Sequence, residues 1–296
     1  MGCADVIPGV SGGTVAFISG IYEELINSIK SIDAEAVRLL FTFRFAECWK
    51  KVNGNFLISV LAGIVTSLLS LSKLMTYLLE HHPIPVWSFF FGLIMVSSPL
   101  IMRDIKKWNF FTVVAFVIGI VAAYLITILA PTETPTNLFF IFFCGALAIC
   151  AMILPGISGA FILLLIGKYE YMITSLIEFN MPVIIVFVIG CFLGLVGFSH
   201  FLSWILTHYR FPTLAVLAGF MIGSLNKVWP WKVVTSFRTN HEGLQVPEFD
   251  MSVWPGRYFA TTGQDPKIFY AILFAALGIF LVVAIEKTAS YLKSKN

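Results

Sequence analysis

The sequence predicts an all-α polytopic membrane protein with an inverted-topology repeat, each half of which is a re-entrant helical hairpin plus three transmembrane helices. Three observations lead to this fold class. Of the 296 residues, 58% are hydrophobic and 12% are charged, and the mean hydropathy is +0.91, whereas about 25% of the residues in soluble domains are charged. Six apolar stretches are long enough to cross a bilayer, which takes ~17–25 residues. A motif of unusual composition occurs twice.

The repeated motif occupies residues 3–29 and 150–176, and 11 of its 27 positions are identical at an offset of 147. Each copy carries the core Pro-Gly-x-Ser-Gly, in which proline and glycine interrupt a helix. The apolar arm after each break is nine residues long. At ~1.5 Å per residue, such an arm covers less than half of a ~30 Å hydrocarbon core. We therefore expect two re-entrant hairpins, at 3–20 and 137–167.

Each hairpin is followed by three predicted spans. They lie at 56–79, 84–102 and 109–130 in the first half, and at 182–207, 212–227 and 268–285 in the second. At an offset of 127, glycines and prolines beyond the motif also match: Gly63, Pro85 and Gly92 with Gly190, Pro212 and Gly219. The first repeat therefore covers 1–130 and the second 131–296. Each half has an odd number of crossings, so the halves have opposite orientations, as in many secondary transporters.

Loop charges assign the two faces. With the basic segment 30–55 in the cytoplasm, the short loops and the C-terminal tail place twelve Lys and Arg inside and one outside, as the positive-inside rule expects. The first hairpin then enters from the cytoplasm and the second from outside. The long loop 228–267 is rich in Trp and Pro, and we expect it on the outer surface. Only two residues precede the first motif, whereas an apolar arm precedes the second, so we expect the natural start upstream of Met1.

The motif cores are the predicted substrate site. Backbone N–H groups at the start of a helix favour anions such as phosphate, and serine and threonine hydroxyls can add donors. The candidate residues are Pro8, Gly9, Ser11, Gly12, Gly13 and Thr14 in the first copy and Pro155, Gly156, Ser158 and Gly159 in the second. The alternative is that these glycines only allow helices to pack closely, as small residues do in membranes.

Ionisable residues near the membrane supply further candidates. Lys73 and His200 occupy equivalent positions in the two halves and can approach a phosphate; alternatively, they extend to the interface. Candidates for coupling to H⁺ or Na⁺ are Asp5, Glu23 and Glu170, with a helix cap or an interface marker as the alternative roles. The five cysteines have no metal-ligand spacing. We expect no metal, cofactor, nucleotide or nucleic acid.

These motifs carry a family resemblance. The stretch ADVIPGVSGGTVAFISGIYEELI, with its second copy ILPGISGAFILLLIGKYEYM, resembles the bacterial polyprenyl-phosphate transporter family, the PopT proteins. The resemblance implies a multi-pass protein of the bacterial cell membrane without catalytic residues. It also implies transport of undecaprenyl phosphate, the carrier lipid of cell-envelope and peptidoglycan synthesis, from the outer to the inner leaflet. The inverted repeats predict that this transport occurs by alternating access, with one midplane site exposed to the two faces in turn.

Two other functions remain open from the sequence. One is a transporter or channel for a small soluble anion, which nothing in the sequence excludes. The other is an intramembrane lipid-pyrophosphate phosphatase, since such enzymes also have inverted re-entrant loops with a Pro-Gly-x-Ser stretch. A phosphatase of that kind needs an arginine beside the serine, where this chain has Gly12 and Gly159, and a cluster of acids for metal, which is lacking.

Overall fold

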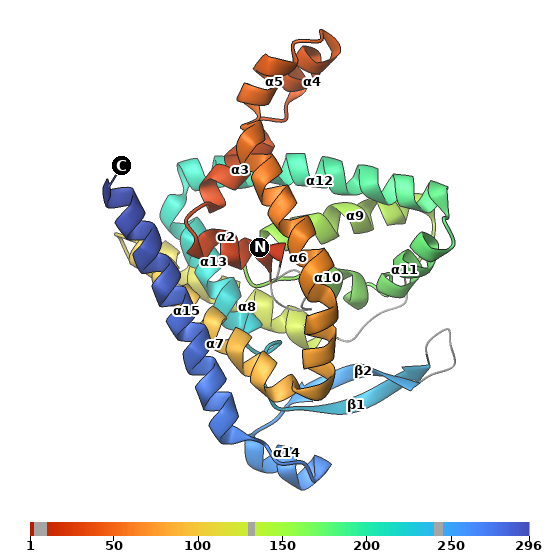
Figure 1. Ribbon diagram of the computed structural model, residues 1–296, viewed down its shortest axis with the longest axis vertical. Coiled ribbons are helices and arrows are strands. Elements are labelled where there is room, and N and C mark those ends of the chain that lie inside the picture. The colour runs from red at the N-terminus through yellow and green to blue at the C-terminus, as the bar shows by residue number, and fades with distance from the viewer. Residues whose placement is uncertain (3–10, 130–133, 240–244, 296) are drawn as a thin grey trace.

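The protein is a bundle of helices with a small two-stranded antiparallel sheet at one end (Figure 1). The computed structural model describes residues 1–2, 11–129, 134–239 and 245–295. The elements of the first half are α2 (Gly12–Ile18), α3 (Tyr22–Lys30), α4 (Ala34–Phe41), α5 (Phe45–Lys51), α6 (Gly54–His81), α7 (Pro83–Arg103) and α8 (Phe110–Ile128). Those of the second half are α9 (Leu138–Ile153), α10 (Gly159–Leu165), α11 (Tyr169–Ile177), α12 (Met181–His208), α13 (Arg210–Ser224), β1 (Lys232–Thr239), β2 (Gln245–Ser252), α14 (Pro255–Thr262) and α15 (Ile268–Lys295).

Within the described ranges, five helices are long and apolar enough to cross a bilayer: α6, α7, α8, α12 and α15. They correspond to five of the six predicted spans. The sixth predicted span, 212–227, corresponds to α13, which has 15 residues and ends at Ser224. Its length of ~22 Å is shorter than that of the five long helices. The polar residues Asn226 and Lys227 follow it in a turn. Most of α13 is buried, so it is an inner helix of the bundle.

Two helix pairs hold the two halves together, and glycines make both pairs close. In the pair α7–α15, a Cβ on Gly92 would lie 2.1 Å from the Ala275 carbonyl oxygen, and one on Gly278 would lie 2.2 Å from that of Phe89. The pair α8–α13 has the same arrangement, with Gly119 and Gly219 against backbone oxygens of the opposite helix. Each pair combines one helix from each half, so the halves interlock rather than stack.

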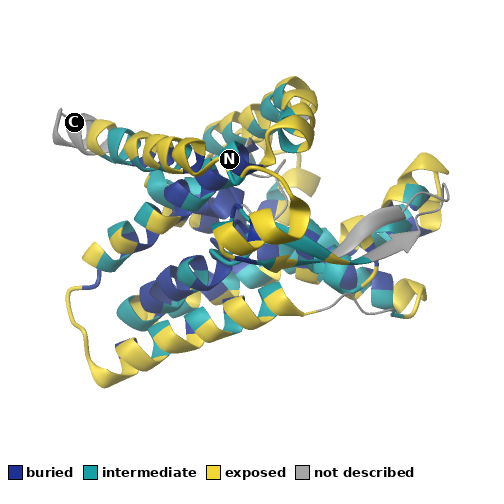
Figure 2. Cartoon of the chain, turned by 90° about the horizontal axis from the view of Figure 1, so that it is seen from below, coloured by how far each residue is buried: buried dark blue, intermediate teal, exposed yellow. Residues whose placement is uncertain are grey.

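The core lies between these pairs. Figure 2 shows buried residues concentrated in the interior of the bundle and exposed residues along the outer helices. The span of α7 is 61% buried and that of α6 only 6%. The exposed side chains of α6 are largely apolar. An apolar surface of this kind is what a helix facing lipid presents.

Side-chain contacts join helix ends at two opposite ends of the bundle. At one end, Arg103 at the end of α7 pairs with Glu286 on α15 at 3.3 Å. At the other, the Asn226 amide donates to Thr127 Oγ1 near the end of α8 (2.9 Å), and the Trp231 indole donates to the backbone oxygen of Pro266 (2.8 Å). The first set of residues belongs to segments that the loop charges assign to the cytoplasm, and the second set to segments assigned to the outside.

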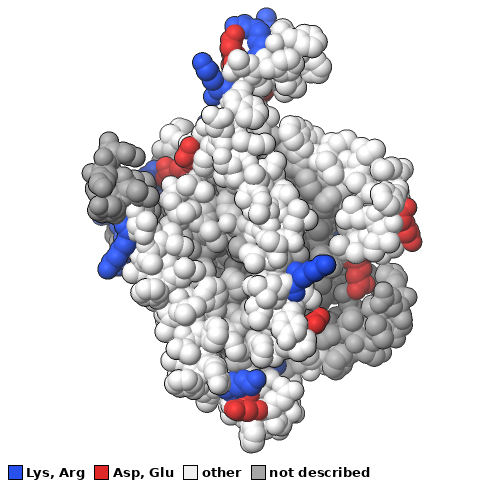
Figure 3. Space-filling view, in the orientation of Figure 1, with Lys and Arg blue, Asp and Glu red and all other residues white. Residues whose placement is uncertain are grey.

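Two segments outside the bundle have secondary structure of their own. The α4–α5 segment projects from one end (Figure 1) and carries much of the Lys and Arg on the face shown in Figure 3, while the rest of that face is mostly uncharged. In the predicted loop 228–267, the chain instead forms the β1–β2 hairpin and α14. The strand KVVTSFRT is rich in β-branched and aromatic residues, a strand signal that the Trp and Pro content of the loop obscured.

Candidate functional site

The first motif copy forms a short helix with a serine cap. Ser11 is the N-cap of α2, and its hydroxyl oxygen accepts a hydrogen bond from the Gly13 amide (3.0 Å), the usual arrangement at a helix start. The helix ends at Ile18, and Gly20 takes a positive φ of 72° that glycine adopts without strain. The chain then turns into α3. Pro8 and Gly9, the predicted break, lie outside the described residues.

The second copy forms two helices joined by a break. Helix α9 ends at Ile153, and α10 begins at Gly159. Between them Gly156 has a φ of +89°, a conformation that favours glycine. The two helices pack tightly, since a Cβ on Gly159 would lie 2.4 Å from the Ala148 oxygen.

Hydrogen bonds also join the start of this second hairpin, just before α9, to its end, just after α10. Thr134, just before α9, accepts a hydrogen bond on its backbone oxygen from the buried Lys168 ammonium (2.6 Å) and donates its hydroxyl to the Ile166 oxygen (2.5 Å). The chain therefore returns toward the point where it started. After Leu165, the axis bends by 106° into α11. A short arm of seven residues followed by such a bend does not continue as a straight span.

The two motif copies contact each other directly. The Ser11 hydroxyl lies within hydrogen-bond distance of two backbone oxygens in the second copy, Met152 (2.9 Å) and Leu154 (3.1 Å). In the other direction, the Gly156 amide donates to Thr14 Oγ1 (3.0 Å). We call the contact formed by these groups the motif contact. It brings together residues that are more than 140 positions apart in the sequence.

The motif contact is tight and buried. A Cβ on Gly13 would lie 2.3 Å from the Ile153 oxygen, so the two backbones touch only because this residue has no side chain. Ser11 and Thr14 are buried, as are Pro155, Gly156 and Gly159. Ser158 is buried too, but its side chain makes no cap hydrogen bond to α10. The contact is therefore a small polar interface inside an apolar bundle, where each donor needs a partner.

Three of the charged and titratable candidates lie on α6, α11 and α12, whereas the motif contact is formed by α2 and the break between α9 and α10. Lys73 is exposed on α6. His200 is partly buried on α12, with its Nδ1 2.9 Å from the backbone oxygen of Val196. Glu170 is partly buried on α11, and Asp5 lies outside the described residues. Among the described residues, no hydrogen bond or ion pair joins Lys73 or His200 to Ser11, Thr14 or Gly156.

Glu23 instead takes part in a polar cavity at the end of the bundle assigned to the cytoplasm. It pairs with Arg210 at 2.8 Å, and both side chains are about half exposed (49% each). A cavity of about 290 Å³ lies beside this pair. Ser203 donates to the Asn27 amide oxygen there (3.1 Å) and accepts from the Lys30 ammonium (3.2 Å). The ion pair connects α3 of the first half to α13 of the second.

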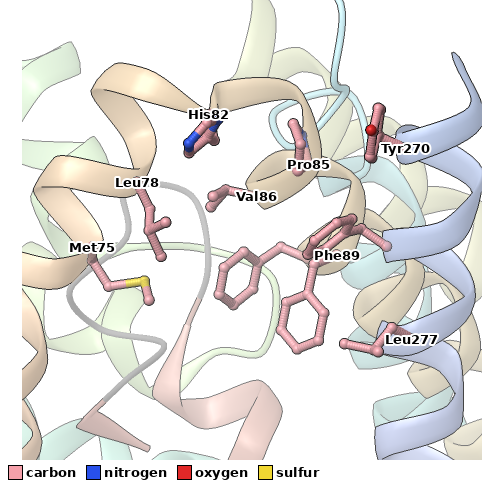
Figure 4. Close-up of a pocket in the computed structure, with 10 residues that line it drawn as sticks. Met75, Leu78, His82, Pro85, Val86, Phe89, Tyr270 and Leu277 are labelled. Atoms are coloured by element: carbon pink, nitrogen blue, oxygen red, sulfur yellow. The ribbon is translucent and has the colours of Figure 1, made fainter. Parts of the chain in front are cut away.

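An apolar groove runs along the outside of the bundle between α6, α7 and α15 (Figure 4). It has a volume of about 470 Å³. In Figure 4, Met75 and Leu78 of α6 lie on one side of it and Leu277 of α15 on the other, with Phe89 of α7 between them. His82 is at the rim. A groove lined in this way accommodates hydrocarbon.

Sequence reasoning missed a cluster of charged residues at the β-hairpin end. Lys227 and Lys232 both approach Asp250 on β2. The two lysines flank the run Val-Trp-Pro-Trp, and charged residues beside interfacial tryptophans were the available signal. In the part of the chain that the structure describes, no group of three or more His, Cys, Asp or Glu side chains is arranged to hold a metal ion.

Comparisons with a family model and with two curated relatives agree on one protein family. Residues 1–246 match the VCA0040-like family, described as undecaprenyl phosphate translocase-like. A polyprenyl-phosphate transporter of Vibrio cholerae serotype O1 is 43% identical over 289 residues, which is 98% of this chain and 94% of the relative. A polyprenyl-phosphate transporter of Staphylococcus aureus is 34% identical over 248 residues, 78% of this chain and 83% of the relative. No solved structure matches the chain significantly. The chain therefore belongs to the undecaprenyl phosphate translocase-like family of membrane proteins.

Proposed function

We propose that this protein transports polyprenyl phosphate in the bacterial cell membrane and returns this carrier lipid from the outer to the inner leaflet. The observation that carries the proposal is the 43% identity to a polyprenyl-phosphate transporter over nearly the whole chain. The bundle of long apolar helices supports it. So does the buried polar contact at its centre, because a phosphate crossing hydrocarbon without polar partners pays a very large desolvation cost.

The phosphate site proposed here is the motif contact. In the described arrangement, the Ser11 hydroxyl points to the backbone oxygens of Met152 and Leu154, and the Gly156 amide to Thr14. Phosphate oxygens are better acceptors for such donors than neutral groups are. An arriving phosphate would take over the Ser11 and Gly156 donors and thereby separate the two motif copies.

Separation of the copies provides a route to alternating access. The halves are joined at one end by the Glu23–Arg210 ion pair and at the other by the Asn226–Thr127 hydrogen bond. We propose that these two joints open in turn while the phosphate stays near the middle of the bundle, as inverted-repeat transporters do. The coupling ion is H⁺ or Na⁺, with Asp5, Glu23 and Glu170 as the candidate carboxylates.

The isoprenoid tail stays outside the polar route. We assign the apolar groove between α6, α7 and α15 to the part of the tail nearest the head group, since aliphatic and aromatic side chains line it. The remainder of the tail lies in the surrounding lipid. This arrangement buries the charge in protein and leaves the hydrocarbon in hydrocarbon, which minimises the work of transfer.

The test is reconstitution of the full chain into liposomes that contain a fluorescent polyprenyl phosphate. Two quantities are measured: the fraction of the lipid accessible to a membrane-impermeant quencher, and the inorganic phosphate released. We expect the lipid to exchange between leaflets in proteoliposomes, faster than in protein-free liposomes, without release of phosphate. Release of phosphate would instead identify an enzyme. Uptake of a water-soluble anion without lipid exchange would identify a transporter of small anions and overturn the proposal.

A further inference from the structure

A polar cavity of about 400 Å³ lies at the β-hairpin end of the bundle, away from the motif contact. Its walls come from the end of α8, the turn after α13 and both strands of the hairpin. Hydrogen bonds fix these walls, because Asn226 donates to Thr127 Oγ1 (2.9 Å) and accepts on its backbone oxygen from the Ser252 hydroxyl (3.1 Å). The cavity is therefore part of the fold rather than a gap between loose loops.

Two lysines and one aspartate face this cavity. Lys232 Nζ is 3.1 Å from Asp250 Oδ2, and Lys227 Nζ is 3.7 Å from Oδ1, beyond the usual hydrogen-bond distance. The lysine side chains are only 13% and 17% exposed, while Asp250 is 36% exposed. Burial, followed by the nearby Lys227 charge, lowers the pKa of Lys232 to about 8. Against the cost of its own burial, the two ammonium groups hold the pKa of Asp250 below its usual value.

The cluster has more positive charge and more donors than its own groups satisfy. Two ammonium groups supply six N–H donors, and one carboxylate supplies one negative charge. The net charge is +1 in a place where water has limited access, so an additional anion is stabilising. A phosphate monoester brings about two negative charges and three acceptor oxygens, which matches the excess of donors.

We propose that the cavity bounded by Lys227, Lys232 and Asp250 binds a phosphate monoester, the head group of a polyprenyl phosphate that arrives from the side of the membrane carrying the β-hairpin. This inference rests on the proposed function and adds a second phosphate site to it. It makes the cavity a capture site that precedes the motif contact on the transport route.

Aromatic rings fix the positions of both lysines. Lys232 Nζ lies 5.6 Å from the ring centroid of Trp87 on α7. Lys227 Nζ lies 4.4 Å from that of Phe161 on α10, two residues after Gly159 of the second motif copy. Such cation–π contacts hold an ammonium group without using its N–H donors for hydrogen bonds. The Phe161 contact also connects the cavity physically to the helix that begins at the motif contact.

The test measures binding of farnesyl phosphate, inorganic phosphate and farnesol to the purified full chain in nanodiscs. The variants are Lys227→Gln, Lys232→Gln and Asp250→Asn, with Arg257→Gln as the matched control, because Arg257 is exposed on α14 at the same end. Lys227→Arg and Lys232→Arg keep the charge and serve as conservative variants. Thermal unfolding of each variant is recorded alongside.

We expect each lysine-to-glutamine change to weaken farnesyl phosphate binding about tenfold, the loss of one charge-assisted contact, with Arg257→Gln within twofold of the wild type. Asp250→Asn raises the net charge of the cavity, so it should tighten binding. Inorganic phosphate should bind more weakly and show the same dependence on the lysines, and farnesol should be insensitive to them.

Three results would overturn the inference. One is wild-type affinity in both lysine-to-glutamine variants. A second is weaker binding together with lower thermal stability in Asp250→Asn, which would make the cluster a structural ion pair of the hairpin. The third is equal affinity for inorganic and farnesyl phosphate, which would remove the assignment to a lipid head group. If the wild type exchanges polyprenyl phosphate between leaflets while the lysine variants bind normally, only this inference fails. If the wild type neither binds nor exchanges the lipid, the proposed function fails as well.

Discussion

Replacing Gly13 by alanine should slow lipid exchange by perturbing the motif contact alone. The new Cβ would lie 2.3 Å from the Ile153 backbone oxygen, whereas ordinary contacts begin at 3.4 Å. The two motif copies must therefore move apart by roughly 1 Å, because backbone cannot rotate away as a side chain can. A movement of that size lengthens the Gly156 to Thr14 hydrogen bond from 3.0 Å to a distance at which it no longer forms.

The energetic cost follows from these changes. Overpacking a tight contact costs ~1–3 kcal/mol, and an intramolecular hydrogen bond contributes ~0.5–1.5 kcal/mol. In the proposed cycle, the motif contact closes again each time the phosphate leaves. Each 1.4 kcal/mol by which the closed contact is destabilised therefore lowers the exchange rate about tenfold. We expect Gly13→Ala to reduce exchange of fluorescent polyprenyl phosphate in proteoliposomes by at least tenfold.

Gly197→Ala is the matched control. Gly197 is also a helical glycine, on α12, but a Cβ there meets nothing within 4 Å. Thr14→Val provides a second perturbation, since it keeps the shape of the side chain and removes the acceptor for the Gly156 amide. Thr14→Ser keeps a hydroxyl acceptor for the Gly156 amide and should retain lipid exchange. Exchange at the wild-type rate in both Gly13→Ala and Thr14→Val, with all variants inserted and monodisperse, would refute a role for the motif contact in transport.

Three further changes test other parts of the structure. Gly119→Ala places a Cβ 2.4 Å from the Val216 oxygen and should lower the free energy of unfolding by ~1–3 kcal/mol, seen as a lower melting temperature than that of Gly197→Ala. Binding of farnesyl phosphate should be strongest between pH ~6, the second pKa of a phosphate monoester, and pH 8. Above pH 8 the affinity should fall, because Lys232, whose pKa is about 8, loses the charge that attracts the anion. In Lys232→Arg the affinity should not fall in this range. An affinity that does not change with pH in the wild type would contradict the reasoning. Among the described residues that line the cavity, the charged and titratable groups beside that lysine are Lys227, Asp250 and Tyr124. Glu23→Gln removes an ion pair to Arg210 that is half exposed, so it should change the free energy of unfolding by less than ~1 kcal/mol, measured by chemical denaturation.

The long spans could be predicted from the sequence because bilayer thickness sets the length of an apolar run. Helices α6, α7, α8, α12 and α15 follow that rule. The predicted span 212–227 extends past the end of α13 at Ser224, since the hydropathy of a stretch does not show where the backbone turns. The hairpin β1–β2 was not predicted, because its residues were interpreted as part of a loop. A β-strand is stabilised by pairing with another segment, and hydropathy along one stretch does not reveal that pairing.

The partners of the motif residues could not be predicted. The repeat shows that Ser11 and Ser158 are equivalent, and from this the two serines were expected to serve alike. The structure distinguishes them, because the Ser11 hydroxyl accepts a hydrogen bond from the Gly13 amide at the start of α2, whereas Ser158 makes no cap hydrogen bond to α10. Which group a buried donor meets depends on how distant helices pack, and one sequence carries no direct information about that.

The same physical argument explains a difference between the two copies of the motif. At the offset of 147, Gly13 matches Ala160. Only Gly13 has the Ile153 oxygen at a distance that excludes a side chain. At the same offset, the counterpart of Ile153 is Val6, which lies outside the described residues. The two copies therefore differ in sequence at this position, and the close approach that excludes a side chain is described for the first copy.

The next position of the repeat also differs between the two copies, and it contributes to a different proposed site in each. Thr14 matches Phe161; the threonine hydroxyl accepts from Gly156, while the phenylalanine ring lies under the Lys227 ammonium. One position therefore closes the motif contact in the first copy and holds a lysine of the proposed capture site in the second. Two identical halves would offer a phosphate the same affinity from either face. In the second copy, the ring at this position supports a lysine of the proposed capture site, which Thr14 in the first copy cannot do. We therefore expect capture from the β-hairpin side. Because unequal affinity alone moves no net cargo, direction still requires the coupling ion.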